Sequence, residues 1–249
     1  RSCYPAFWIR DYAMSLETGF ITPAEQKHML ELVAANQCDQ TWITKGGSIV
    51  PYGAIADHIR IDDGLPVYFP GTLGYEDQGN KTFGIFPPYD DQYYFIHMAW
   101  HYVMTTGDKN ILNEHINYRV LSDRLITAFH LPPSHEENHL VYTTDDFRGV
   151  DFGFRDVITM TGDLCFTSLL KYRAATEMAD LMKVSGTLKA SALYSEIAEK
   201  IKSSIPSVFP DEKGMLRAST GKSGQPDVWA TALAIYFGIL EGERAGRAA

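Results

Sequence analysis

Four short segments of the sequence combine carboxylates with guanidinium groups, amides or aromatic rings. They are residues 7–12 (FWIRDY), 88–94 (PYDDQYY), 150–156 (VDFGFRD) and 225–229 (QPDVW). Carboxylates and guanidinium groups form paired hydrogen bonds with neighbouring polar atoms, and aromatic faces pack against apolar surfaces such as the C–H face of a sugar ring. Together the segments predict a carbohydrate pocket. Taken singly, each is also explained by helix capping and by aromatic packing in a core.

The residues expected to contact a sugar are polar and aromatic side chains of these segments. They are Trp8, Arg10, Asp11, Tyr89, Asp90, Asp91, Arg155, Gln225 and Trp229. Cleavage of a glycosidic bond also needs a carboxylic acid that protonates the leaving oxygen and a second carboxylate that activates water or attacks the sugar. Asp151 is the predicted acid, because the two phenylalanines that closely follow it offer an apolar setting that raises a carboxyl pKa. The second carboxylate stays open among Asp11, Asp91 and Asp227.

No metal or cofactor site is predicted. His97 and His101 have the i, i+4 spacing that can bind a metal, but no further ligand is indicated and the H-E-x-x-H pattern is absent. The sequence also lacks the dinucleotide fingerprint, the P-loop and the G-x-S-x-G elbow of serine hydrolases. Cys3, Cys38 and Cys165 are widely spaced, which favours buried free thiols over a zinc knuckle.

The overall composition is typical of a globular protein with an acidic surface. The chain has 249 residues and a formal net charge of −9, so its surface would repel nucleic-acid phosphates and anionic membranes. No apolar run approaches the roughly 20 residues that span a bilayer. The expected partner is therefore a carbohydrate, not a nucleic acid or a membrane. The chain starts without Met, which indicates a processed or trimmed end, and neither the compartment nor the oligomeric state is indicated.

The elements that must position these residues are helices. Apolar periodicity and capping residues predict helices at 6–20, 23–36, 90–106, 109–129, 159–184, 187–203 and 226–240. The connections alternate between short turns and long irregular stretches, of which residues 37–88 and 130–158 are the longest. Short turns imply antiparallel helical hairpins, so the long loops should gather at one end and form one face. An all-α fold with a loop-built site is expected.

At these residues the chain resembles the six-hairpin, (α/α)6 toroid glycoside hydrolases, and trehalases and processing α-glucosidases are the members most similar in motif. Residues 7–11 resemble the aromatic and charged segment that opens an early helix in such enzymes. Residues 88–108 are similar to their next helix pair. Residues 149–155 (GVDFGFR) are similar to the family stretch G-W-D-F-x-x-R, with Val in place of Trp. The resemblance implies that Asp151 is the general acid of an inverting mechanism.

The resemblance also sets an expectation for the fold. A toroid of six hairpins has twelve helices, whereas the sequence predicts seven. Residues 1–249 are therefore expected to form a single helical-hairpin domain, as an incomplete toroid or as a fragment that lacks the last hairpins, where these relatives carry the general base. Two alternatives to a glycosidase stay open. One is a non-catalytic carbohydrate-binding protein on the same fold, and the other is a sugar epimerase or polysaccharide lyase with His58 or His97 as base.

Overall fold

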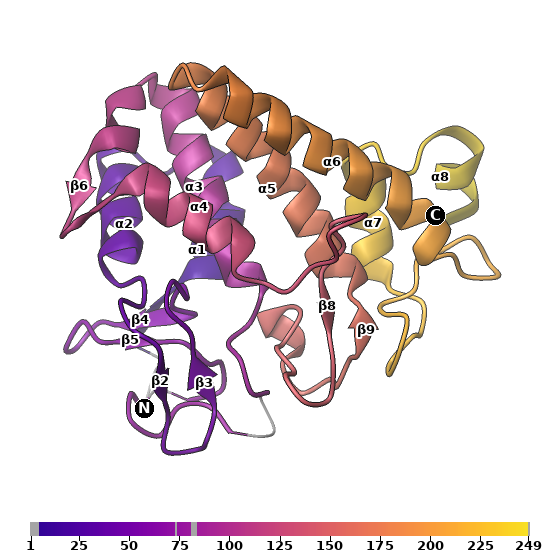
Figure 1. Ribbon diagram of the computed structural model, residues 1–249, viewed down its shortest axis with the longest axis horizontal. Helices are drawn as coiled ribbons and strands as arrows, with labels where there is room; N and C mark the ends of the chain where they lie inside the picture. Colours follow the sequence, from indigo (N-terminus) through magenta and orange to yellow (C-terminus); the bar gives the residue numbers. More distant parts are fainter. Residues whose placement is uncertain (1–4, 73, 81–83, 249) are drawn as a thin grey trace.

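The computed structural model describes residues 5–72, 74–80 and 84–248. In these residues the chain forms eight α-helices, joined by loops and short strands (Figure 1). The helices are α1 (Ile9–Ser15), α2 (Pro23–Ala35), α3 (Asp90–Thr106), α4 (Leu121–His130), α5 (Cys165–Val184), α6 (Leu188–Val208), α7 (Val228–Tyr236) and α8 (Gly242–Ala248). Three short 3-10 helices are η1 (Leu16–Thr18), η2 (Lys109–Asn113) and η3 (Gly153–Arg155).

The strands are each two or three residues long, so the helices supply the framework. A three-stranded antiparallel sheet has the order β1-β4-β5, with Phe7 opposite Ile59. The other strands form three antiparallel pairs, β2–β3, β6–β7 and β8–β9. The strand bounds are β1 (Ala6–Trp8), β2 (Trp42–Ile43), β3 (Ile49–Val50), β4 (His58–Arg60), β5 (Pro66–Val67), β6 (His115–Ile116), β7 (Arg119–Val120), β8 (Tyr142–Thr143) and β9 (Gly162–Asp163).

Capping residues explain where two of the predicted helices begin and end. Thr22 caps α2, because its hydroxyl accepts a hydrogen bond from the backbone N–H of Glu25 at 3.3 Å, and Pro23 takes the first helical position. Helix α3 ends at Gly107, whose φ of 76° is a left-handed conformation that Gly adopts without strain. The predicted helix at 90–106 is confirmed.

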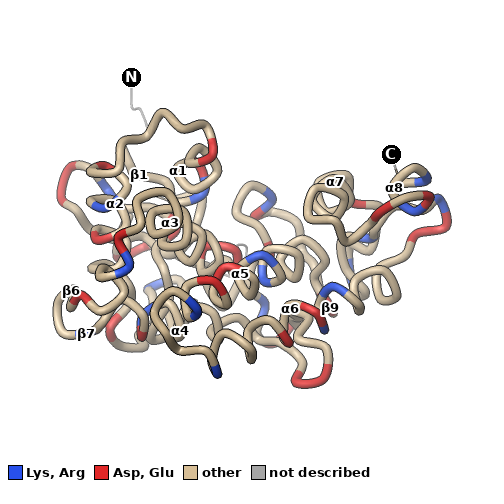
Figure 2. Tube along the Cα trace, turned by 90° about the horizontal axis from the view of Figure 1, so that it is seen from above, with Lys and Arg blue, Asp and Glu red and all other residues tan. Residues whose placement is uncertain are grey.

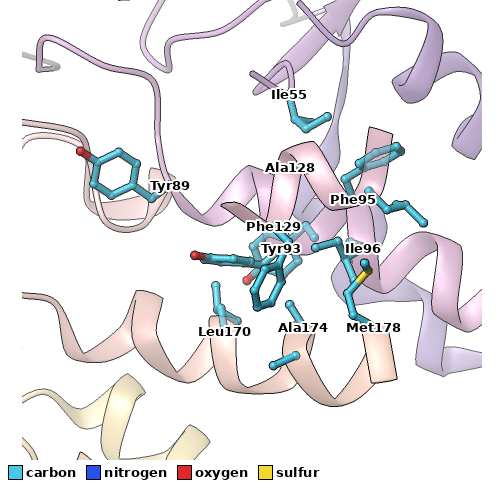
Figure 3. Packing of buried hydrophobic residues seen from close by; sticks show 14 of the residues in the cluster. Ile55, Tyr89, Tyr93, Phe95, Ile96, Ala128, Phe129, Leu170, Ala174 and Met178 are labelled. Atoms are coloured by element: carbon cyan, nitrogen blue, oxygen red, sulfur yellow. The ribbon is translucent and has the colours of Figure 1, made fainter. Parts of the chain in front are cut away.

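The core lies where α3 packs against its neighbours. Helix α3 contacts α1, α2, α4 and α5, and α5 forms an antiparallel pair with α6 (Figure 1). Figure 3 shows Tyr93 of α3, Phe129 of α4 and Met178 of α5 gathered between these helices. The Tyr93 and Phe129 rings meet edge to face, with 6.3 Å between their centroids. Cys38 and Cys165 are buried free thiols, as expected, and Cys3 lies outside the described residues.

Several predicted helices are shorter in the structure. Residues 6–8 form β1, because they pair with β4 instead of continuing α1. Residues 109–120 form η2 and the β6–β7 hairpin, in which Asn117 has a φ of 58°, so α4 begins only at Leu121. The long helix predicted from residue 159 begins at Cys165, because Gly162 and Asp163 pair with β8. The helix predicted at 226–240 spans only Val228–Tyr236.

The long loops lie at one end of the helices, as the loop lengths predict. In Figure 1, strands β2–β5, β8 and β9 lie below the helices, while the α5–α6 turn lies at the opposite end. Seen from above in Figure 2, acidic and basic positions are interspersed along the trace. None of the described helices is long and apolar enough to cross a membrane.

Candidate active site

The polar residues of the four segments meet where several helices begin. Arg10 lies in the first turn of α1, Asp90 and Asp91 in the first turn of α3, and Asp227 is the N-cap of α7. Residues 151–155 form the loop and 3-10 turn that precede α5. Helix N-termini carry partial positive charge, so carboxylates are favoured at this position. The chain thus concentrates acids and arginines at the loop end of its helices.

Arg10 is the centre of a buried ion cluster. Its side chain is 2% exposed, and it contacts three carboxylates that are fully buried. Its Nε donates to Asp90 Oδ2 at 2.6 Å, one Nη contacts Asp57, and the other Nη lies 2.7 Å from Asp91 Oδ1. Gly153 packs against the guanidinium so closely that a Cβ at this position would lie 2.0 Å from Arg10 Cζ. Only Gly fits here without a shift of the cluster.

The three carboxylates around Arg10 cannot share one positive charge equally. Burial raises the pKa of Asp91 well above its usual range, and the neighbouring carboxylates of Asp90 and Asp57 add to that effect. Burial also acts on Asp57, but Arg10 and the adjacent His58 outweigh it and lower the pKa of Asp57. His58 Nδ1 lies 2.7 Å from Asp57 Oδ2. The cluster therefore favours an ionised Asp57 and a neutral Asp91.

A second buried cluster joins the loop before α5 to the start of α7. Arg155 donates from one Nη to Asp151 Oδ2 at 2.7 Å and from the other to Asp227 Oδ2 at 2.6 Å. The second oxygen of Asp227 accepts the backbone N–H of Ala230 at 3.0 Å and so caps α7. Burial raises the pKa of Asp151 to about 6, although Arg155 opposes the shift. A carboxyl of this kind can hold a proton near neutral pH and donate it.

Two adjoining cavities lie beside the second cluster. The larger, of about 440 Å³, lies between α1, α3, α5 and α7 and is lined by residues that include Phe152 and Trp229. The smaller, of about 230 Å³, is lined by Arg155, Gln225 and Asp227 and shares Trp229 with the larger one. Trp229 is 51% exposed, so its ring faces the open space and could stack on a ligand.

The sequence-predicted site residues fall into two groups. The structure brings six of them into two buried ion clusters, Arg10 with Asp90 and Asp91, and Arg155 with Asp151 and Asp227. It places Gln225 and Trp229 in a cavity wall. The others lie elsewhere. Asp11 is exposed to solvent, Tyr89 is buried with its hydroxyl on the Phe147 carbonyl at 3.3 Å, and Trp8 packs on the His58 ring.

Some residues of the site have only a weak signal in the sequence. Asp57 lies in an irregular stretch with no spacing that ties it to Arg10. Arg173 and Glu177 follow each other at i, i+4 on the long helix α5, and Glu177 Oε1 lies 2.5 Å from His97 Nδ1. An oppositely charged pair at helical spacing is the signal that could have found these two residues. In the described ranges, no three His, Cys, Asp or Glu side chains are placed to hold a metal ion.

Comparison with known proteins shows similarity in fold but not in sequence. No family model matches the chain, and no curated protein matches its sequence. Solved structures do match, among them a GH78 family rhamnosidase of Bacillus sp. GL1, with a TM-score of 0.65 and 11% identity. A rhamnosidase from Klebsiella oxytoca with rhamnose bound matches with a TM-score of 0.64 and 11% identity.

Each match covers 97% of this chain, but only 22% of the Bacillus protein and 40% of the Klebsiella protein. The chain therefore has the fold of one part of these longer proteins.

Proposed function

We propose that the protein hydrolyses a glycosidic bond, with Asp151 as the general acid. The observation that carries this proposal is the buried Asp151 carboxyl, whose pKa of about 6 lets it keep a proton near neutral pH. Arg155 holds this carboxyl and also lines the cavity beside Trp229. The acid, a cation that orients it and an aromatic platform thus occur together at the loop face.

Asp227 is the proposed second carboxylate. It lines the same cavity as Arg155, whereas Asp11 is exposed on α1 and Asp91 is fully buried beside Arg10 with a raised pKa. A neutral Asp91 would be a poor base, since a general base must accept a proton. We further propose that the chain is an incomplete toroid of helical hairpins and that hydrolysis inverts the anomeric centre.

The substrate class is also a proposal. The two solved structures described above are named rhamnosidases, so an aryl rhamnoside is the first substrate to test, followed by aryl glucosides and trehalose. The rate of hydrolysis is measured from the release of the aryl group. NMR of the sugar first released shows its anomeric configuration. Retention of configuration would contradict the inverting mechanism.

A pair of variants tests the acid. Asp151→Asn should lower kcat by at least about 100-fold, the size expected for losing a general acid, while sugar binding persists. Asp146→Asn, at an exposed position of a neighbouring loop, is the control and should keep full activity. If the Asp151→Asn enzyme stays active, Asp151 is not the acid.

A second candidate function rests on His97. His97 lines the larger cavity, and its contact with Glu177 would orient the ring toward a ligand in that cavity. This arrangement favours sugar epimerisation or polysaccharide elimination with His97 as base. His58, the other histidine considered for that role, is fully buried. Loss of epimerase or lyase activity in His97→Gln, with Asp151→Asn still active, would favour this function over hydrolysis.

A further inference from the structure

We infer that a site between α3, α5 and the residue that follows α7 binds a single neutral sugar ring through His97, Arg173 and Glu177. A cavity of about 210 Å³ lies there, and it shares His97, Arg173 and Glu17 with the larger cavity described above. His97 comes seven residues after Asp90 on α3, which places it roughly 10 Å further along the helix. The inference concerns binding alone and does not require the protein to be a hydrolase.

Buried polar atoms in this cavity have no hydrogen-bond partner among the described residues. They are Glu177 Oε2 and the Nε and one Nη of Arg173. The Glu177 residue is 4% exposed, and its other oxygen is engaged by His97. A buried carboxylate oxygen without a partner costs free energy, so its persistence points to a ligand group that donates to it. Arg173 Nε lies 3.7 Å from Glu177 Oε1, an ion pair without a hydrogen bond, so the N–H groups of Arg173 likewise lack an acceptor.

The mixture of unpaired donors and acceptors identifies the chemistry of the ligand. A hydroxyl group both donates and accepts, so neighbouring hydroxyls could satisfy Arg173 and Glu177 together. His97 directs Nδ1 at Glu177, which leaves its Nε2 as a further polar atom for a hydroxyl group. A simple cation would leave the Arg173 donors unpaired, and an anion would leave Glu177 unpaired.

The charge around the cavity gives the same answer. Glu17, Glu177 and Asp180 line it together with the single guanidinium of Arg173, so carboxylates outnumber guanidinium groups three to one in its wall. Asp180 accepts the indole N–H of Trp100 at 3.0 Å, which fixes that ring at the cavity wall. A negative wall disfavours phosphates and carboxylates, so the ligand is neutral.

Aromatic rings supply the apolar part of the site. The Trp100 ring stacks on His97 at a centroid distance of 5.9 Å, and Tyr172 and Phe237 contact each other across 6.1 Å. All four residues line the cavity. Sugar rings have apolar C–H faces that pack on such surfaces, and the volume is below the roughly 300 Å³ at which drug-sized pockets begin. These features favour one ring over an oligosaccharide.

The test measures binding in the Asp151→Asn protein, so that turnover plays no part. D-Glucose and L-rhamnose serve as neutral ligands, and D-glucuronate differs from glucose by one carboxylate. Titration calorimetry should detect binding of a neutral sugar, and glucuronate should bind at least tenfold more weakly. The Arg173 Nε–H signal in the NMR spectrum, assigned by its loss in Arg173→Met, should shift when the sugar is added.

Variants locate the site. Arg173→Met and Glu177→Gln should each weaken sugar binding by tenfold or more. Lys183→Met, at an exposed position near the end of the same helix, should change the affinity less than twofold. Circular dichroism shows whether each variant is folded, and the two variants act as independent tests. Unchanged affinity in both, or tighter binding of glucuronate than of glucose, would overturn the inference. Failure of hydrolysis would leave this binding result unaffected.

Discussion

Asp57 and Asp91 contact the same guanidinium but favour opposite protonation states. Asp57 is held ionised by Arg10 and His58, whereas burial and two neighbouring carboxylates favour the neutral form of Asp91. An Asn side chain resembles a neutral carboxylic acid in shape and differs from a carboxylate in charge. The two positions should therefore respond differently to the same substitution.

We expect Asp91→Asn to change the free energy of unfolding at pH 5 by less than about 1 kcal/mol. Asp57→Asn should destabilise by about 3–5 kcal/mol, because it breaks a buried ion pair and leaves Arg10 undercompensated. Since the pKa of Asp57 is lowered on folding, its contribution is present above the unfolded pKa and is lost as the pH falls through the folded value. Urea unfolding at pH 5 and pH 3 measures the free energy of unfolding of both variants. Equal losses of stability in the two variants would contradict the assigned protonation states.

Asp151, the proposed general acid, should set the pH dependence of the proposed hydrolysis. A general acid must be protonated, so kcat/KM should fall as the pH rises through about 6, the pKa of Asp151. Arg155 lowers that pKa, so Arg155→Gln should move this fall in kcat/KM to higher pH by on the order of one unit, together with a loss of rate. Lys222→Gln, at an exposed ion pair with Asp145, is the control and should leave the pH at which kcat/KM falls unchanged. If that pH is also unchanged in Arg155→Gln, Asp151 is not the general acid.

At the residue scale, the sequence shows which groups are unusual but not how they pair. The run Asp90-Asp91 and the Asp151–Arg155 spacing are visible in the sequence, and both prove to be buried ion clusters. The contact of Arg10 with Asp57 is not predictable, because it joins residues 47 apart through a loop with no periodic pattern. The apolar setting of Asp151 also differs in detail, since Phe152 is buried but Phe154 is 48% exposed.

At the scale of elements, Gly153 links the start of η3 to α1. A methyl group at this position would overlap the Arg10 guanidinium, so Gly153→Ala should displace the ion cluster and destabilise the protein by about 1–3 kcal/mol. Gly246→Ala is the matched control, since no atom lies within 4 Å of its would-be Cβ and it sits in helix α8. Thermal unfolding compares them. A Gly153→Ala protein as stable as the control would show that the cluster adapts easily.

Elements were predictable where local signals agree with tertiary packing. Helix α3 has sustained apolar periodicity and a terminal Gly, and the interval 90–106 matches the structure. The sequence pattern does not predict the β6–β7 hairpin, because its strands have two residues each and their stability comes from packing between α2 and α4. The pattern predicts a helix at strand β1 for a similar reason, since only its distant partner β4 makes it extended.

At the scale of the whole molecule, one buried lysine should control the pH dependence of global stability. Lys171 on α5 is 2% exposed, its Nζ bonds to Ser134 Oγ, and burial lowers its pKa to about 7. The unfolded chain therefore holds more protons than the folded chain between about pH 7 and pH 10.5, and the free energy of unfolding should rise with pH across this window.

Lys171→Met should remove that slope and raise the free energy of unfolding at pH 7 by about 1–4 kcal/mol, because a buried amine is replaced by an apolar side chain of similar length. Lys189→Met, an exposed position on α6, should leave both quantities unchanged. Urea titrations at pH 7 and pH 9 measure the effect. A wild-type protein whose stability does not change between these pH values would contradict it.

The larger cavity has walls from segments that are far apart in the chain. Helix α1 and η1 contribute Met14 and Glu17, whereas α7 contributes Trp229 and Tyr236, whose hydroxyl donates to Glu17 at 3.2 Å. During synthesis on the ribosome, this cavity cannot form until the segment around residue 236 has emerged and docked. A ligand that fills it acts as a clamp between early and late segments, so it should slow the separation of α7 from α1 and protect their amides from hydrogen exchange.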